Sequence, residues 1–344
     1  MQTWPKIKTL VSIFFNVITN SLLAKQAVIF FITACSLKAY PQQVQSDEEY
    51  YSILDEYSHL GIGFTNRHNS FTVLFKDYKE ANTRYVSNSK RVLGIGFHLF
   101  NVGLAFSMPL STKEGAFNNI DFRSNILERR WGLDIAFQKY LGYESEVVRD
   151  DVFFSNTMIN GYYIFNFRKY SLPATSKFLE IQNKNAGSFL GHVVFSRTRV
   201  QADSSLFSSM PLVPNDTLRR LRGFRFVYAG LLPGYGYTFS KNLFFANLAL
   251  SVGPVHVWKK YDFERFDEKD FSFDWATLWR TTVGYSSKRL FYGISAYLSH
   301  LKVDYKEVGV NASSWQVKLF VGLRFQEKGV FRKSISDVYQ AKKL

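Results

Sequence analysis

The stretch FSFDWATLWRTTVGY, residues 271–285, alternates between two kinds of side chain. Its odd-numbered positions are aromatic or β-branched, whereas its even-numbered positions are mostly small or polar, with Leu278 as the exception. Successive side chains of a β-strand point to opposite faces of a sheet. The stretch therefore predicts a strand with one apolar face and one polar face.

The same alternation continues on both sides of this stretch and predicts an all-β protein. The predicted strands are 90–99, 102–108, 118–127, 130–140, 153–166, 168–177, 186–200, 223–239, 243–258, 271–286, 289–303 and 314–326. That makes twelve. Short turns are expected at one edge of the sheet and long loops at the other. Counting back from the last strand, which should end at the edge with the short turns, places the short turn at residue 167 at the edge with the long loops. A miscount in 167–190 or an earlier strand at 70–77 would remove that conflict, so ten or fourteen strands stay open.

Apolar and polar side chains alternate along the strands of both a soluble β-sandwich and a membrane β-barrel. The length of the strands distinguishes the two folds. All predicted strands except 102–108 have 10 to 17 residues, which is long enough for a tilted crossing of a bilayer. Strands in lipid must pair on both edges, so we expect a closed antiparallel transmembrane barrel. The predicted lipid-facing girdle is Trp131, Trp275, Trp279 and Trp315. The predicted lumen-lining residues are Asp134, Asp274, Arg280, Lys318 and Arg324.

Composition excludes several other classes of protein. The chain has 344 residues, with 43 basic and 28 acidic residues and a formal net charge of +15. One cysteine cannot form an internal disulfide. After residue 40, no apolar run approaches the roughly 20 residues that a spanning helix needs. No basic and aromatic residues interleave as nucleic-acid binding would require, so we expect anionic lipid headgroups of the outer membrane to be the partner of the positive charge.

The two ends of the chain predict export and a division into four parts. Lysines precede an apolar stretch at 27–34, which is typical of a secretory signal. Cleavage after Ala39, lipidation at Cys35 and a retained anchor helix are the three outcomes considered. The expected parts are a signal peptide at 1–39, a periplasmic entry segment at 40–89 with a further strand at 70–77 left open, a barrel at 90–326 and a basic periplasmic tail at 327–344.

Three stretches resemble one family of bacterial membrane proteins. They are NSKRVLGIG at 88–96, RWGLDIAFQKYLGY at 130–143 and the segment 184–205, which contains AGSFL and ADSS. They are similar to the Bacteroidetes outer-membrane barrels grouped as domain of unknown function 4421. The chain departs from the family pattern at His192, Val193 and Val194. The resemblance implies a barrel in the outer membrane of a Gram-negative bacterium and implies no activity.

Candidate chemistry in this sequence is sparse. The glycine-rich stretches lack the Gly-Lys-Ser/Thr ending of a phosphate loop, and the six histidines show no metal-ligand spacing. We therefore expect no cofactor and no metal. A lipid-modifying hydrolase would need a set such as His192, Asp203 and either Ser188 or Ser196. The alternative is that His192 is an ordinary polar residue of a strand.

The leading functional hypothesis is a barrel without enzymatic activity, either a pore or an envelope scaffold. The charged lumen is compatible with a selectivity lining and equally with a salt-bridged plug. A lipid-modifying hydrolase and a membrane subunit of a secretion or gliding assembly are the alternatives. The stretch FVGLRF at 320–325 is typical of the final strand read by the barrel-insertion machinery, which we expect to be a partner during assembly. The sequence indicates no substrate and no oligomeric state.

Overall fold

A computed structural model gives the fold of the protein. It describes residues 49–54, 57–75, 82–88, 90–99, 102–110, 119–127, 129–145, 148–206, 220–264, 267–305 and 308–326. The predicted signal peptide with Cys35 and Ala39, and the predicted tail 327–344, lie outside the described residues. In the part of the chain that the structure describes, no helix is long and apolar enough to cross a membrane.

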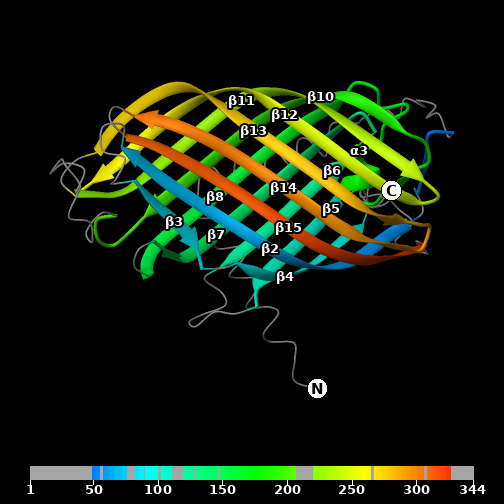
Figure 1. Ribbon diagram of the computed structural model, residues 1–344, viewed down its shortest axis with the longest axis horizontal. Coiled ribbons are helices and arrows are strands. Elements are labelled where there is room, and N and C mark those ends of the chain that lie inside the picture. The colour runs from blue at the N-terminus through cyan, green and yellow to red at the C-terminus, as the bar shows by residue number, and fades with distance from the viewer. Residues whose placement is uncertain are drawn as a thin grey trace, which may run out of the picture. The chain divides into compact units, whose positions relative to one another are not determined.

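Twelve antiparallel strands form a closed barrel (Figure 1). They are β2 (Tyr57–Phe75), β4 (Arg91–Leu99), β5 (Val102–Pro109), β6 (Ile120–Leu127), β7 (Trp131–Glu144), β8 (Val148–Ile164), β10 (Ala186–Gln201), β11 (Leu221–Lys241), β12 (Phe244–Phe263), β13 (Asp267–Ser286), β14 (Leu290–Tyr305) and β15 (Val308–Gln326). The first and last of them pair along their whole length, from Tyr57 opposite Gln326 to Phe75 opposite Val308. This pairing closes the sheet and confirms the predicted fold and strand number.

The connections distinguish two ends of the barrel. The turn end holds the start of β2, the end of β15 and hairpins such as Asn242–Leu243, where both residues have positive φ values of 50° and 71°. Both residues of a type I′ turn have such values, and this turn suits the twist of paired strands. At the loop end, longer connections join the strands, such as the one between the end of β10 and the start of β11, and β3 (Thr83–Ser87) pairs there with both β2 and β7.

Two sequence predictions about the strands were wrong. The barrel begins at Tyr57 and not at residue 90, because β2 (Tyr57–Phe75) lies within the predicted entry segment 40–89. Apolar residues alternate at Leu60, Ile62 and Phe64, but residues 66–70 are all polar and interrupt this pattern. For this reason the sequence analysis left open only a short strand at 70–77. The segment 168–177 is not a strand but a run of turns followed by the helix α3 (Leu172–Ser176). The sequence analysis missed one strand, β2, and predicted one strand that does not exist, 168–177. These two errors cancel, so the predicted total of twelve strands is correct.

The outer face of the sheet is apolar between two bands of aromatic side chains. Phe273, Trp275 and Leu319 are 76%, 65% and 52% exposed on this face. On β12 the outward positions from Phe244 to Trp258 are apolar except for His256, which packs against Trp258 and Phe273. Fourteen steps of about 3.3 Å give about 46 Å along the strand, or about 33 Å across a bilayer at a tilt near 45°. The outer face therefore matches the thickness of a membrane.

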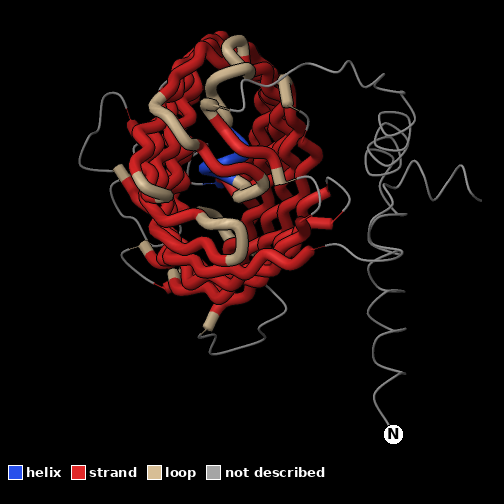
Figure 2. The backbone as a smooth tube through the Cα atoms, turned by 90° about the vertical axis from the view of Figure 1, so that its right-hand side faces the viewer, coloured by secondary structure: helices blue, strands red, loops and turns tan. Residues whose placement is uncertain are grey.

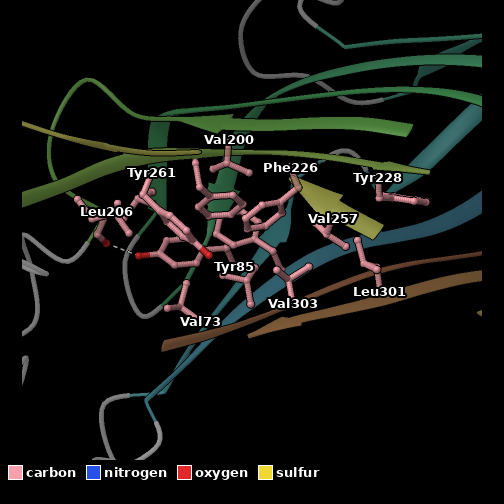
Figure 3. Close-up of a cluster of buried hydrophobic side chains, with 14 of the residues drawn as sticks. Val73, Tyr85, Val200, Leu206, Phe226, Tyr228, Val257, Tyr261, Leu301 and Val303 are labelled. Carbon is pink, nitrogen blue, oxygen red and sulfur yellow. Dashed lines mark hydrogen bonds between the residues drawn. The ribbon is translucent and has the colours of Figure 1, made fainter. Parts of the chain in front are cut away.

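The inner face packs two separate hydrophobic clusters at the two ends of the lumen. The larger one lies at the loop end and includes Phe71, Tyr85, Phe226 and Tyr261, each at most 2% exposed. Figure 3 shows its side chains converging from several strands onto one another. The smaller cluster lies at the turn end and includes Tyr162, Tyr170 and Leu172. Polar and charged side chains fill the layer between the two clusters.

Candidate functional site

The connection between β8 and β10, residues 165–185, folds into the barrel at the turn end. We name this segment the plug. Figure 2 shows its helix α3 inside the ring of strands. After the helix, β9 (Glu180–Gln182) pairs with β1 (Tyr51–Ile53), so the chain that precedes the barrel is bound to the plug. A long connection at the turn end explains the orientation conflict that arose when 168–177 was counted as a strand.

Local sequence explains why the plug forms a helix. Ser171 caps α3, because its hydroxyl accepts a hydrogen bond from the backbone N–H of Ala174 at 2.9 Å and donates one to Glu180. Pro173 follows in the first turn, where a missing N–H costs nothing. Gln182 then closes the segment: its Oε1 accepts from the Ser171 N–H at 2.9 Å, and its Nε2 donates to the Lys169 carbonyl at 2.7 Å.

A charged contact fixes the inner end of the plug. Lys177 follows α3 and places its Nζ 2.8 Å from Oδ1 of Asp134 on β7, while Arg280 on β13 places Nη2 3.9 Å from Oδ2 of the same carboxylate. Burial lowers the pKa of Lys177, and Asp134 offsets part of this effect. Two cations thus share one carboxylate at mid-barrel.

A second contact fixes the outer part of the plug. Phe178 has a φ of 60°, a left-handed conformation that is rare for a bulky residue. Its ring stacks on Phe291, with centroids 4.5 Å apart, and its carbonyl accepts from Nε of Arg324 at 2.8 Å. Gly322 leaves room for this packing, because a Cβ there would lie 2.1 Å from Phe291 Cζ. The barrel wall therefore stabilises a backbone conformation that is unfavourable in isolation.

Tyr170 anchors the plug to the opposite wall. Its hydroxyl accepts from Nδ2 of Asn247 at 3.1 Å, and burial raises the pKa of Tyr170 to about 12. The ring lies against Gly236, where a Cβ would be 2.3 Å from the phenol oxygen. Contacts from Tyr170, Lys177 and Phe178 thus hold the plug on several sides.

A polar network crosses the middle of the lumen. Arg67 on β2 donates through Nη1 to Asp121 at 3.2 Å and to the Tyr140 hydroxyl at 2.9 Å. Arg123 reaches the other oxygen of Asp121 at 3.2 Å, and Gln138 donates to Asp121 at 3.2 Å as well. Arg67 and Asp121 are 2% and 5% exposed. Because every member has a partner, the network can persist away from bulk water.

The chain also folds over the lumen at the loop end. Arg149 on β8 binds Asp151 through two hydrogen bonds of 2.8 and 2.9 Å, and it donates to the Ser205 carbonyl at 3.1 Å. Ser204 donates to Asp151 at 3.1 Å. Beyond them, the carbonyl of Leu206 accepts from the hydroxyl of Tyr85 (Figure 3). The segment 202–206 is therefore held over the hydrophobic cluster of the loop end.

Small cavities lie between these packed layers, and two of them are lined by described residues of the lumen. The first has a volume of about 80 Å³ and is lined by Asp134, Lys177, His192 and Arg280 among others. The second has a volume of about 60 Å³ and is lined by polar groups such as Asn69, together with Met158 and Leu301. Cavities of this size and polarity hold a few water molecules. Chemically, the arrangement can retain water or a small ion.

The predicted lumen residues lie on the inner face, and they fall into different contacts. Asp134 and Arg280 meet the plug at mid-barrel, and Arg324 binds it from the turn end. Asp274 accepts from the hydroxyl of Ser272, away from the plug. Lys318 lies half-buried on β15. On the outer face, the predicted girdle comprises three exposed tryptophans, Trp131, Trp275 and Trp315, and the half-buried Trp279.

The residues of the hypothetical hydrolase do not come together. Ser188 and Ser196 each lie four residues from His192 on β10, or about 13 Å along a strand. Ser188 binds the backbone of Asn166, Ser196 binds Asn156, and His192 Nδ1 lies 3.0 Å from Asn160 Oδ1. Asp203 is exposed at the loop end. In the described ranges, no three His, Cys, Asp or Glu side chains gather as metal ligands would.

Several central residues were missed by the sequence analysis. Arg67 was missed because β2 was assigned to the entry segment, and Lys177 and Phe178 because their segment was read as a strand. Asp121 and Arg123 lie in a predicted strand, and their i, i+2 spacing of opposite charges on one face was an available signal.

A closed antiparallel barrel with an apolar outer band and a filled lumen defines a β-barrel of the outer-membrane class. The chain belongs to the family described as "Domain of unknown function (DUF4421)", whose model matches residues 45–325. This match confirms the resemblance, while the link to Bacteroidetes stays a prediction. The sequence matches no curated protein.

Solved structures of bacterial barrels are similar to this chain at low identity. Outer membrane protease OmpT from Escherichia coli has 8% identity and a TM-score of 0.39, over 80% of this chain and 98% of that chain. Ail, the attachment invasion locus protein of Yersinia pestis, has 10% identity and a TM-score of 0.20, over 78% and 99%. The translocator domain of autotransporter NalP from Neisseria meningitidis has 9% identity and a TM-score of 0.24, over 88% and 98%.

Proposed function

We propose that this protein is a plugged, non-conducting barrel of the bacterial outer membrane that serves as an envelope scaffold without enzymatic activity. The observation that carries the proposal is the plug, held at mid-barrel by Asp134 and Arg280 and at the turn end by Arg324. A pore needs a continuous aqueous path. Here two hydrophobic clusters and the polar network lie along the axis that ions would follow.

The proposal places the turn end in the periplasm and the loop end outside the cell. Outer-membrane barrels have short periplasmic turns and longer external loops. Both ends of the sheet, Tyr57 and Gln326, lie at the turn end, where the plug enters the lumen. With this orientation the lumen is blocked from both compartments, by the plug below and by the segment 202–206 above.

The remaining alternatives receive less support. A hydrolase centred on His192 would need a nucleophile beside the imidazole, and the nearest partner is the amide of Asn160. A subunit of a secretion or gliding assembly would need a surface shaped for a partner, and no observation selects one. We also propose that the barrel-insertion machinery is a partner during assembly and that membrane lipids are partners of the assembled barrel.

Planar-bilayer conductance tests the closed lumen. We expect the purified full-length protein to insert and to give no steady current steps in concentrated salt. Heat-modifiable gel migration shows that the inserted protein is folded. Steady, ion-selective steps from the wild-type protein would contradict the proposal and would favour the pore.

A lipid-release assay tests the absence of catalysis. Wild-type protein and the His192→Ala variant should both give the rate of protein-free vesicles, because no nucleophile lies beside His192. Release by the wild type that His192→Ala abolishes would support the hydrolase instead. Thr198→Ala is the matched control, since Thr198 binds Asn156 on the same strand pair and lies outside the candidate hydrolase set.

A further inference from the structure

Cations line up across neighbouring strands on the outer wall near the loop end. Arg199 on β10 lies opposite Arg225 on β11, Arg225 lies opposite Lys260 on β12, and Lys260 lies opposite Lys269 on β13. We name these four residues the basic row. Adjacent strands are about 4.8 Å apart, so the row spans about 14 Å of the wall. Arg197 lies two residues from Arg199 on the same face.

The protein itself neutralises only part of this row. Lys260 binds Asp262 and Asp267 at 2.9 and 2.7 Å. Arg199 has a neutral partner, the Gln201 amide oxygen at 2.5 Å. The Nε atoms of Arg199 and Arg225 are shielded from water and have no hydrogen-bond partner among the described residues. Like charges directly opposite each other destabilise a sheet. An anion from outside the chain would therefore neutralise the remaining positive charge of the basic row and reduce the repulsion between its cations.

The position of the row indicates where that anion comes from. Aromatic side chains of the outer band end directly below it: Phe195 is two residues from Arg197, Trp258 is two residues from Lys260, and Phe271 is two residues from Lys269. Trp258 and Phe271 lie opposite each other across β12 and β13. Aromatic bands mark the boundary between acyl chains and headgroups. The basic row thus lies at headgroup level.

We propose that the basic row binds the phosphate groups of a lipid in the leaflet at the loop end, with acyl chains against the aromatic side chains below. The occupant is a phosphate-bearing lipid, because the row lies on an open outer wall that does not enclose a free ion. Several cations along about 14 Å favour a headgroup with more than one phosphate. The inference rests on the proposed membrane placement but not on the closed lumen, so a conducting barrel would leave it unaffected.

Lipid retention by the purified full-length protein tests this site. The protein is exchanged into nanodiscs of phosphatidylcholine that contain a minor fraction of a diphosphorylated glycolipid, and bound lipid is counted by native mass spectrometry. The double variant Arg199→Gln/Arg225→Gln should bind the glycolipid about 30-fold more weakly, since each surface cation contributes roughly fivefold in affinity. Unchanged heat-modifiable migration shows that the variant is folded.

Two comparisons make the result decisive. Lys288→Gln/Arg289→Gln removes two exposed cations from the turn end and should leave glycolipid retention unchanged. Millimolar inorganic phosphate should not displace the glycolipid from the wild type. Equal retention by wild type and Arg199→Gln/Arg225→Gln, an equal loss in the turn-end variant, or full displacement by inorganic phosphate would each overturn the proposal.

Discussion

At the scale of single residues, charge placement inside the lumen controls how the plug is held. Asp134 faces Lys177 and Arg280, and its side chain is 15% exposed. Removing one member of a buried ion pair leaves the other charge without compensation. Arg324 acts differently, because it binds the plug through a backbone carbonyl and covers the ring of Phe291 at 4.9 Å. Single side chains from the wall therefore determine where the plug lies.

Asp134→Asn should destabilise the folded barrel by about 3 kcal/mol, because Lys177 and Arg280 then lack a buried counter-charge. The free energy of unfolding can be measured by urea titration in detergent, read by heat-modifiable migration. Adding Lys177→Met to this variant should restore most of the loss. A single variant as stable as the wild type would show that the ion pair does not hold the plug.

Neighbouring positions on β15 should differ sharply in their tolerance of charge. Leu319 is 52% exposed on the outer face, whereas Lys318 is half-buried on the inner face. An arginine facing lipid near the midplane costs roughly 2–4 kcal/mol. Leu319→Arg should therefore depress the amount of assembled barrel in outer-membrane fractions, and Lys318→Gln should not. Equal assembly of the two variants would contradict the assigned faces.

At the scale of elements, the plug is a connection that replaces an expected strand. The predicted strand 168–177 contains Pro173, which cannot donate to a ladder, and Ser171, which caps α3 instead. The family-like stretch AGSFL begins directly after the plug, and its Ser188 accepts a hydrogen bond from Asn166 at 2.8 Å. The stretch ADSS supplies Ser204 and Ser205 to the contact at the loop end. Both motifs therefore help to close the lumen.

The last strand should be essential and the residues after it dispensable. Deleting 315–344 removes the part of β15 that pairs with both β14 and β2, from Trp315 to Gln326. The sheet then cannot close, and we expect no insertion into the outer membrane. Deleting 328–344 leaves each of these pairings intact and should insert normally. Membrane fractionation measures both variants; loss of insertion in the shorter deletion would mean that the tail takes part in assembly.

At the scale of the whole molecule, closure of the sheet separates an outer wall from an inner wall. The alternation of apolar and polar side chains along each strand gives these two walls different chemistry. The outer wall is apolar between aromatic bands at both ends, and the inner wall packs on a plug that belongs to the same chain. Because a twelve-stranded barrel is wide, its own inward side chains do not fill it alone, and an inserted segment completes the packing. The basic row lies on the outer wall and takes no part in this internal packing.

The sequence by itself determined the fold class and the face to which side chains such as Trp275 and Arg280 point, whereas its total of twelve strands was correct only because one missed strand offset one false strand. These properties follow from a period of two, which is local and survives in any sheet. Tertiary structure alone decided that β2 closes the barrel and that residues 165–185 enter the lumen. It also brought Arg67 to Asp121, and Lys177 to Asp134. Such contacts join residues far apart in the chain, and no local pattern encodes which segment fills a space that exists only after the sheet has closed.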